Sequence, residues 1–587
     1  MTQRTKNKTT KYPKKGTERR TQIKHTHTQN KLRIIPLGGM EEVGKNMTIF
    51  EYGNDIIVLD MGLQFPEEGM HGIDYIIPNI SYLKGKEKNV KAVIFSHGHL
   101  DHIGAAPILL EKLAYPTILG RPLTLAMIKH RQEDYKPKSS GRIKTISIKD
   151  IKNKFTFGAF KVSFFQVDHS IMDAVGVILE TPQGTIIHPG DWTLDKDKKG
   201  KPILNYSSLA NIKKRPTILM LEALGAVDIR QSASQDEMHK NLTEIIKNSE
   251  GRIIIGTFAS QIERVNWIMQ AAQEAGKKIA LDGYSMKMNI EIAKKLGYVK
   301  VNKETLIKVG SIGDYPDKKI IVIATGAQGE GNAVLSRIIN GSHRNIKLKK
   351  NDTVVLSSSI IPGNEATIQK LKDGLYRQCD NVIHGDLMDI HVSGHGNRSD
   401  ILYILKSIKP DYFIPVYGHH YMLREASKLA SNNGMEKNKI FVLDNGEIAE
   451  FEGKNAKTLE KKVNASNVFV DGLGIGDIGN IVLKDRQVMA DDGMVVTVVQ
   501  VNTKTKKVIN NPDIITRGFI HIKSSEKLME AIRSKVKKLT EDIISKNMPK
   551  KNEQWGSVRA KLRDEMSDFI FKETERHPMV LPVIIKS

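Results

Sequence analysis

Four side chains of the types that bind transition metals lie within six consecutive residues, 97–102. His97, His99, Asp101 and His102 come directly after an apolar run and just before a run of small residues. At this spacing alternate residues can turn towards one cation, while Asp101 and His102 turn towards a second cation about 3.5–4 Å away. The pattern predicts the metal-binding loop of a two-metal hydrolase.

Three more candidate residues stand at the ends of apolar runs elsewhere in the chain. His169 follows the run at 164–167, and Asp191 follows the run at 184–190. Because one carboxylate can bridge two cations, Asp191 is the predicted bridging ligand. Asp60 ends another run and is predicted to orient a ligand histidine from outside the metal shell. Taken singly, residues of these types in such positions are more often ordinary loop or capping residues.

The elements that must position these residues follow an alternating pattern. Apolar runs at 33–39, 56–60 and 92–96 end in polar or glycine residues, which is typical of buried strands with chemistry at one sheet edge. Helical patterns at 105–114 and 261–276 lie between such runs. The sequence predicts an α/β fold.

The remainder of the chain divides into two parts. A second alternation of strands and helices begins near residue 226, and a glycine-rich stretch at 455–492 suits a linker. Beyond it, an apolar run at 494–499 predicts a strand and the amphipathic pattern at 527–546 predicts a helix. These two elements indicate a small α+β domain at the C-terminus.

Composition narrows the class of protein. A chain of 587 residues is long enough for two or three domains, and 40% hydrophobic with 27% charged residues is ordinary for a globular protein. The single cysteine, Cys379, excludes disulfides and cysteine-based zinc sites and fits a reducing cytosol. With no secretory signal and no apolar stretch of about 20 residues, we expect a cytoplasmic protein without membrane partners.

The charge of the chain favours a polyanionic partner. The formal net charge is +24, and residues 1–30 contain nine Lys or Arg against one acid. We expect this segment to be a disordered basic arm that either contacts nucleic acid or is merely solvated. Charge by itself leaves DNA, RNA, the ribosome and a membrane surface open.

Several motifs, in one order along the chain, resemble those of the β-CASP nucleases of the metallo-β-lactamase fold, and most of all the ribonuclease J family. They include LGGMEEVGKN at 37–46, ATGAQGE at 324–330 and HVSGHG at 391–396, with shorter segments at 65–67, 168–171, 361–365, 516–519 and 576–582. The resemblance implies a metallo-β-lactamase αββα sandwich, an inserted β-CASP α/β domain and a small α+β C-terminal domain. The implied divisions are 1–30 (arm), 31–225 and 391–454 (metallo-β-lactamase), 226–390 (β-CASP), 455–492 (linker) and 493–587 (C-terminal).

The resemblance also assigns roles to residues. It implies that His97, His99 and His169 hold one zinc, that Asp101 and His102 hold the other, and that Asp191 bridges them. His391, Ser393, Gly394 and His395 match the residues that bind the substrate phosphate, and Glu222 matches an acid that supports the site. His395, Asp101 and Asp191 are the implied catalytic residues.

This chain departs from the family at two places. Where the family carries a ligand histidine for the second zinc, this chain has Tyr417, followed by Gly418 and His419. Tyrosine must lose a proton near pH 10 to bind zinc, so we expect a weaker second site unless His419 substitutes for it. Around Glu222 the acid is kept, but the hydroxyl residues that usually flank it are replaced by Leu221, Ala223 and Leu224.

The resulting expectation is a ribonuclease with 5′-to-3′ exonuclease and endonuclease activities, acting in mRNA decay and rRNA maturation. Two Zn²⁺, or Mn²⁺ or Mg²⁺ in the weaker site, would supply a metal-held hydroxide that attacks phosphorus. The expected substrate is single-stranded RNA with a 5′-monophosphate. The family resemblance implies a homodimer, a homotetramer or a hetero-oligomer with a paralogue.

Two alternatives use the same residues. Tyr417 suggests a catalytically weak RNA-binding or regulatory subunit. The loop at 97–102 also serves small-molecule hydrolases such as lactamases and thioesterases, but these need neither an inserted domain nor a basic surface of RNA size. Metal content and cleavage of 5′-monophosphorylated RNA would separate the first alternative from the enzyme.

Overall fold

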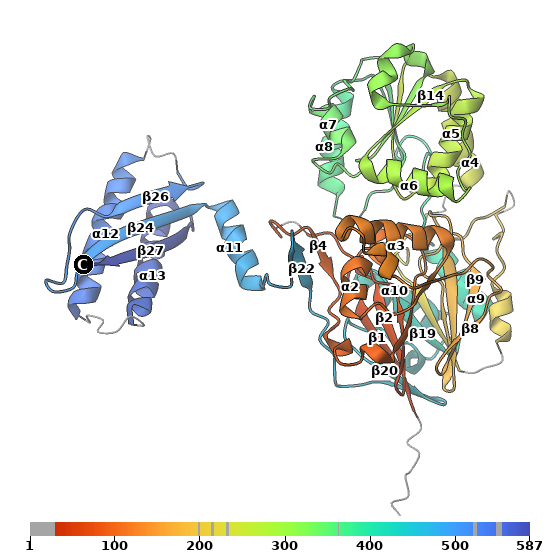
Figure 1. Cartoon of the computed structure of the whole chain (residues 1–587), viewed down its shortest axis with the longest axis horizontal. Coiled ribbons are helices and arrows are strands. Elements are labelled where there is room, and N and C mark those ends of the chain that lie inside the picture. Colours follow the sequence, from red (N-terminus) through yellow and green to blue (C-terminus); the bar gives the residue numbers. More distant parts are fainter. Residues whose placement is uncertain are drawn as a thin grey trace, which may run out of the picture.

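The computed structural model describes residues 30–67, 69–197, 200–212, 216–230, 234–361, 363–520, 525–546 and 554–587. The predicted arm at 1–30 lies outside this part of the chain except for Asn30. Figure 1 shows a two-sheet sandwich, a second α/β body above it and a smaller C-terminal body to one side. The predicted α/β class is confirmed. Within the described ranges, no helix is long and apolar enough to cross a membrane.

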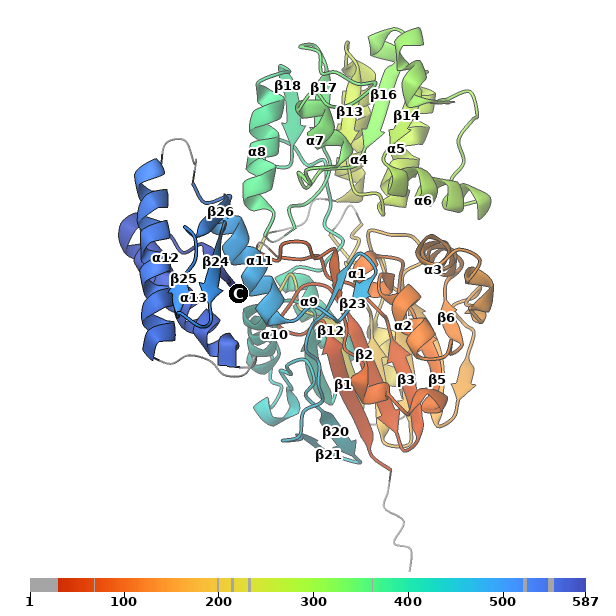
Figure 2. The same ribbon diagram turned by 60° about the vertical axis from the view of Figure 1, so that its left-hand side comes forward.

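The first sheet of the sandwich has eight strands in the order β21-β20-β1-β2-β3-β5-β6-β7. Its strands are β1 (Leu32–Gly38), β2 (Met47–Tyr52), β3 (Asp55–Leu59), β5 (Val90–Ile94), β6 (Ile118–Gly120), β7 (Thr145–Ser147), β20 (Ala449–Glu452) and β21 (Asn455–Thr458). Helices α1 (Leu100–Ile103), α2 (Ala106–Lys112) and α3 (Pro122–Tyr135) lie on its outer side (Figure 2). The outer face is apolar because Ile49 and Val58 pack with Ile108 of α2 in one buried cluster.

The second sheet has six strands in the order β19-β12-β11-β10-β9-β8. Its elements are β8 (Phe155–Phe157), β9 (Phe160–Gln166), β10 (Val175–Thr181), β11 (Gly184–His188), β12 (Thr217–Glu222) and β19 (Tyr412–Val416), with α9 (Arg398–Ile408) and α10 (His420–Asn432) packed against it. Phe50 and Ile57 of the first sheet share a buried cluster with Leu179 and Leu219 of the second, so the two sheets pack face to face.

The chain leaves the second sheet after β12 and returns to it at β19, which pairs with β12 in parallel. Between them lies a parallel sheet in the order β15-β14-β16-β13-β17-β18. This body contains β13 (Ile253–Gly256), β14 (Lys278–Asp282), β15 (Leu306–Ile307), β16 (Ile320–Ala324), β17 (Thr353–Leu356) and β18 (Asn381–His384), with α4 (Gln235–Asn248), α5 (Ile262–Glu274), α6 (Tyr284–Lys295), α7 (Val334–Ile339) and α8 (Glu365–Tyr376). It is the inserted domain, and the predicted helix at 261–276 is α5.

The C-terminal body is a small α+β domain. Its elements are β24 (Met494–Asn502), β25 (Lys507–Val508), β26 (Asp513–Arg517), β27 (Met579–Lys586), α12 (Glu526–Lys546) and α13 (Gln554–Thr574). β24 pairs with β26 antiparallel and with β27 in parallel. Both helices pack on one face of the sheet, where Ile532 and Leu562 belong to a core with Val499. The predicted helix at 527–546 is α12.

The segment interpreted as a linker, 455–492, is more ordered than its glycine content suggested. Strand β21 extends the first sheet by pairing with β20, and β22 (Val468–Asp471) pairs with β4 (Tyr75–Ile77). β23 (Gly474–Ile475) and α11 (Asn480–Asp491) follow, and α11 buries none of its residues. The partner of β22 lies far away in sequence, which a local pattern does not reveal, whereas β21 forms a local hairpin with β20. The domain boundaries given above stay a prediction.

Candidate active site

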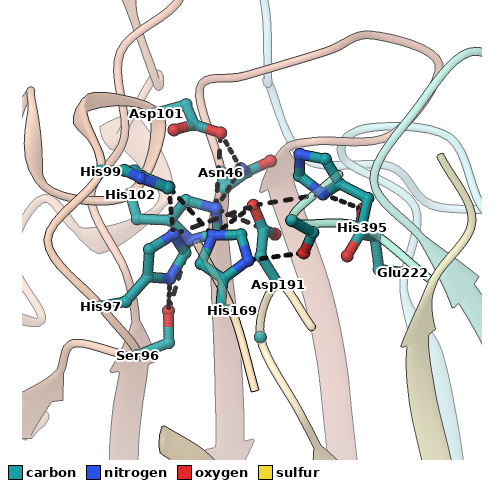
Figure 3. Close-up of polar contacts among 12 residues, drawn as sticks. Asn46, Ser96, His97, His99, Asp101, His102, His169, Asp191, Glu222 and His395 are labelled. Carbon is teal, nitrogen blue, oxygen red and sulfur yellow. Dashed lines mark hydrogen bonds and ion pairs between the residues drawn. The ribbon is translucent and has the colours of Figure 1, made fainter. Parts of the chain in front are cut away.

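The predicted metal ligands lie at neighbouring strand ends of the sandwich, next to the inserted domain (Figure 3). The loop with His97 and His99 follows β5, His169 follows β9, and Asp191 follows β11. Tyr298, just after α6 of the inserted domain, donates a hydrogen bond to Asp173 on the loop after His169. The candidate site therefore lies where the two domains meet.

Four donor groups converge on one point in this site. His99 Nδ1 lies 3.1 Å from His97 Nε2 and 3.0 Å from His169 Nε2. Asp191 Oδ2 lies 3.8 Å from His97 Nε2 and 3.9 Å from His169 Nε2. A tetrahedral ion with bonds of about 2.0–2.1 Å would separate its ligand atoms by roughly 3.3–3.4 Å. This first donor set therefore fits a divalent metal ion.

The three histidines of the first donor set have free lone pairs at neutral pH. Burial, together with neighbouring histidines, lowers the pKa of His97 well below its ordinary value. Burial lowers the pKa of His99 to about 4 and that of His169 to about 3. His169 Nδ1 lies 2.7 Å from the Gly394 carbonyl oxygen, so Nδ1–H donates there and Nε2 keeps its lone pair for a metal.

A second donor set shares Asp191 with the first. His102 Nε2 lies 3.2 Å from Asp191 Oδ1 and 3.4 Å from Asp101 Oδ2. His102 Nδ1–H donates to Asp60 Oδ2 over 2.8 Å, which is the orienting contact predicted for Asp60. Although burial opposes it, Asp191, Asp101 and Asp60 raise the pKa of His102 well above its ordinary value. A proton therefore occupies His102 until a cation displaces it.

Two polar residues that the sequence did not single out support this second set. Ser96 donates to Asp60 through its backbone N–H and its hydroxyl, both over 2.8 Å. The Asn46 amide nitrogen lies 2.8 Å from His102 Nε2 and donates to Asp101 over 3.2 Å. Ser96 ends the apolar run at 92–96 and Asn46 ends the motif at 37–46, but nothing in the local sequence distinguished them from ordinary loop residues.

Tyr417 lies beside the second donor set. Its side chain is buried and its ring lies 5.4 Å from that of His102. His188 Nδ1 accepts a hydrogen bond from Gly190 N–H, so its Nε2–H can donate to the Tyr417 hydroxyl 3.3 Å away. Burial and the surrounding carboxylates raise the pKa of Tyr417 well above 10. A neutral phenol is a poor ligand, so the second set offers three good ligand groups.

His419 does not take the place of the missing histidine. The chain turns away from the site through Tyr417 and Gly418, which have φ of 59° and 106°. His419 then caps α10, with its ring parallel to that of exposed Tyr421. In the described part of the chain it belongs to no group of converging metal-ligand atoms. The suggested substitution by His419 would therefore need a shift of this loop.

The predicted phosphate-binding residues lie on the segment that joins β18 to α9. Gly394 places its carbonyl against His169, and a side chain there would come within 2.6 Å of Ser170 Oγ. Ser393 Oγ accepts a hydrogen bond from the backbone N–H of His395 over 3.1 Å. His391 lies at the start of this turn, on the side of the inserted domain. We call residues 391–395 the phosphate loop.

His395 is paired with Glu222, which ends β12 (Figure 3). Its Nδ1 lies 2.6 Å from Glu222 Oε1 and 3.9 Å from Asp191 Oδ2. Although burial opposes it, Glu222 raises the pKa of His395 to about 9. Burial raises the pKa of Glu222 itself to about 7. His395 is thus an imidazolium at neutral pH, and it can supply a proton or stabilise negative charge beside the donor sets.

Family models match most of the chain. A model described as "Metallo-beta-lactamase superfamily" matches residues 40–224, and "Ribonuclease J, beta-CASP domain" matches 250–375. "Zn-dependent metallo-hydrolase RNA specificity domain" matches 382–443, and "Ribonuclease J C-terminal domain" matches 481–587. The order of these matches agrees with an inserted domain inside a divided sandwich.

Full-length relatives are similar over nearly the whole chain. Ribonuclease J2 of Bacillus subtilis (strain 168) is 36% identical over 567 residues, covering 96% of this chain and 100% of that protein. Ribonuclease J 1 of Streptococcus pyogenes serotype M3 is 35% identical, covering 95% and 98%. Ribonuclease J 2 of Staphylococcus aureus (strain MRSA252) is 32% identical, covering 94% and 98%.

Proposed function

Because the chain belongs to the ribonuclease J family and is a metal-dependent, hydrolytic ribonuclease, we propose that it uses two zinc ions to cleave RNA both from the 5′ end and internally. The predicted fold, the ribonuclease function and RNA as substrate agree with these matches. The alternative of a catalytically weak subunit is not favoured by them. We propose mRNA decay and rRNA maturation in the cytoplasm as its setting, in keeping with a single, buried cysteine.

We assign the first donor set, His97, His99 and His169, to one zinc. Asp101 and His102 would hold the second cation, and Asp191 would contact both. Imidazole-rich donors suit zinc, whereas the second set, with two carboxylates and one imidazole, also suits Mn²⁺. When bound, the cations would lower the pKa of water and stabilise the negative charge that develops on the phosphate.

His395 is assigned the proton that the reaction needs. Its Nδ1–H faces Glu222, so Nε2–H is free to point at the substrate. Hydrolysis forms a bond between water oxygen and phosphorus and breaks the bond between phosphorus and the 3′ oxygen. His395 would protonate that leaving oxygen, giving a 3′-hydroxyl and a 5′-phosphate. The main support for the proposal is that the His395 imidazolium lies beside two donor sets that share Asp191.

The phosphate loop is assigned to the 5′-monophosphate of single-stranded RNA. A neutral His391, the Ser393 hydroxyl and the backbone at Gly394 offer donors to an anion. Binding the 5′ end here would place the first phosphodiester bond at the metals. This is the proposed basis of 5′-to-3′ exonuclease activity, and an internal strand that bypasses the loop would be cut as by an endonuclease.

The test compares metal content and cleavage in matched variants. We expect the native protein to bind two metal ions and to cleave 5′-monophosphorylated RNA. His169→Ala should lose at least one ion and slow cleavage by more than about 100-fold, because it removes a ligand from the catalytic metal. His71→Ala, at an exposed histidine, is the control. A native protein that neither binds metal nor cleaves RNA would exclude the proposal.

For assembly we propose a homodimer or homotetramer, or a hetero-oligomer with a paralogue. The outer face of the C-terminal sheet exposes large apolar side chains, namely Ile515, Leu581, Val583 and Ile585. Alternate residues of β27 form this patch, which a second copy would cover. Light scattering of the native protein and of Val583→Lys would test it, since the charge should dissociate the oligomer without disturbing the core.

A further inference from the structure

Arg264, on α5 of the inserted domain, is a buried cation behind the phosphate loop. Arg264 is 6% exposed, and its hydrogen bonds among the described residues go to uncharged groups and not to a carboxylate. Burial lowers the pKa of Arg264 to about 10, which still leaves it charged at neutral pH. A buried arginine is costly unless its hydrogen bonds are used. The role of Arg264 must therefore be sought in what it donates to.

Its guanidinium is directed at the phosphate loop and at the strand end beside it. Arg264 Nη1 lies 2.5 Å from His391 Nδ1, and Nη2 donates to the Val392 carbonyl oxygen over 3.4 Å. The two hydrogens of Nη1 are shared between His391 Nδ1, Gln261 Oε1 at 2.9 Å and the Ser357 carbonyl oxygen at 3.1 Å. Ser357, at the end of β17, donates its hydroxyl to the Ile390 carbonyl oxygen over 2.6 Å. The inserted domain thus holds the first half of the loop.

The sandwich holds the second half of the same loop. The Gly396 N–H donates to the Trp192 carbonyl oxygen over 2.8 Å, and the Gly394 carbonyl accepts from His169. The phosphate loop is therefore fixed to the metal site at one end and to Arg264 at the other. Within the loop, Arg264 contacts His391 and the Val392 carbonyl, so a change at Arg264 acts on the loop through these two residues.

The contact with Arg264 decides which nitrogen of His391 carries the proton. Arginine only donates hydrogen bonds, so His391 Nδ1 must accept, and Nε2 must carry the hydrogen. Burial, and then Arg264 itself, lowers the pKa of His391 well below its ordinary value, so the ring is neutral. His391 Nε2 is buried and has no hydrogen-bond partner among the residues that the structure describes. The ring is left with one N–H donor that no described residue accepts.

We propose that Arg264 is a positioning residue for the 5′-phosphate, which locks His391 as a neutral Nε2–H donor to that phosphate. The proposal rests on the phosphate-binding role given to the loop under the proposed function. In this arrangement Arg264 does not contact RNA. It acts through His391, which would otherwise be free to present an acceptor lone pair and repel the anion.

The test measures discrimination between 5′-monophosphorylated and 5′-hydroxyl RNA of one sequence. Dissociation constants for the full chain are measured by fluorescence anisotropy in EDTA, so that cleavage does not intervene. Arg264→Gln should reduce the preference for the 5′-phosphate by about tenfold or more, as expected for a lost hydrogen bond to a charged group. Arg252→Gln is the matched control, because Arg252 is equally buried in the same domain but pairs with Asp352.

Substitutions of His391 separate positioning from direct contact. The amide nitrogen of His391→Gln can occupy the place of Nε2, whereas His391→Asn is too short, so we expect Gln to keep most of the preference and Asn to lose it. If Arg264 acts only through His391, replacing Arg264 should matter little once His391 is Gln. In the His391→Gln background, Arg264→Gln should therefore change the preference for the 5′-phosphate less than about twofold, whereas two independent sites would add their effects. This pair of variants remains informative even if Arg264→Gln alone fails to fold.

Three results would overturn the proposal. An equal loss from Arg264→Gln in both backgrounds would show that Arg264 binds the phosphate itself or supports only the fold. An equal preference in His391→Gln and His391→Asn would exclude the Nε2–H donor. A native protein without preference for the 5′-phosphate would exclude the site, while cleavage of RNA by the metal-loaded protein would still stand as a separate test of the proposed function.

Discussion

Replacing Glu222 with glutamine tests whether the charge of Glu222 keeps His395 protonated, so that His395 can act as the proton donor. Glutamine keeps the volume and can still accept from the Trp192 N–H, as Glu222 Oε2 does over 3.2 Å. It removes the charge that holds the proton on His395 at 2.6 Å. The variant thus changes the electrostatics of the site while its packing stays the same. We expect the pKa of His395 to fall from about 9 towards its ordinary value.

The size of the effect follows from the protonated fraction of His395. At pH 8 a group with a pKa of about 9 is about 90% protonated, whereas one with an ordinary pKa near 6.5 is about 3% protonated. If His395 is the general acid, Glu222→Gln should therefore slow cleavage at pH 8 by at most about 30-fold. Since 36% of the His395 side chain is exposed, solvent screening reduces this limit, and we expect about tenfold.

The assay is single-turnover cleavage of 5′-monophosphorylated RNA between pH 6 and pH 9.5. A histidine that must be protonated gives activity below its pKa and loses activity as pH rises through it. The alkaline limb of the profile should therefore move to lower pH in Glu222→Gln by about one unit or more. Bound metal ions lower the pKa of His395 in both proteins, so the test compares the pH profiles of the native protein and the variant with each other. Glu250→Gln, at an exposed glutamate, is the control. A uniform loss at every pH, with the limb unmoved, would refute the reasoning.

Four further predictions concern the metals and the C-terminal core. Tyr417→His should strengthen binding of the second metal by about tenfold or more, measured by calorimetry, whereas Tyr417→Phe should leave metal content unchanged; a loss of metal in Tyr417→Phe would show that the phenol is a ligand after all. Asp60→Asn should weaken the second site by about 10–100-fold, because it removes the group that orients His102, and an unchanged affinity would contradict that role. Metal binding at the second site should release one proton, and its affinity should rise by about tenfold for each pH unit between 6 and 8, because the raised pKa keeps His102 protonated in the free protein. The affinity of the first site, whose histidines are already neutral, should not depend on pH in this way. An equal pH dependence at both sites would argue against the assignment. Ile532→Ala, in the core of the C-terminal domain, should lower its free energy of unfolding by about 2–5 kcal/mol in denaturant melts, with exposed Ile585→Ala as the control, and an effect no larger than the control would contradict the packing described.

The sequence was most informative where the chemistry is local. His97, His99, Asp101 and His102 lie within one loop, so their residue types alone predicted a metal site. The apolar runs before them predicted buried strands, because a strand covered on both faces has no polar side to show. The helices at 261–276 and 527–546 were also visible, and they are α5 and α12 with small shifts at the ends. These features depend on neighbours a few residues away.

The sequence was least informative where partners are distant in the chain. Arg264 and His391 are separated by 127 positions, and Tyr417 and His188 by 229. Strand β22 within 455–492 was missed for the same reason, since its hydrogen bonds go to β4. His419 was a plausible ligand from its position beside Tyr417, but two residues with positive φ direct it away from the site.

The sequence by itself therefore determined which ligand-type side chains this ribonuclease has, and the family to which their order belongs. Only the tertiary structure decided how each of them is used. Which nitrogen of His169 or His391 carries the proton depends on a carbonyl or a guanidinium contributed from elsewhere in the chain. Protonation depends on burial and on charges a few ångströms away through space, and only folding brings those charges together.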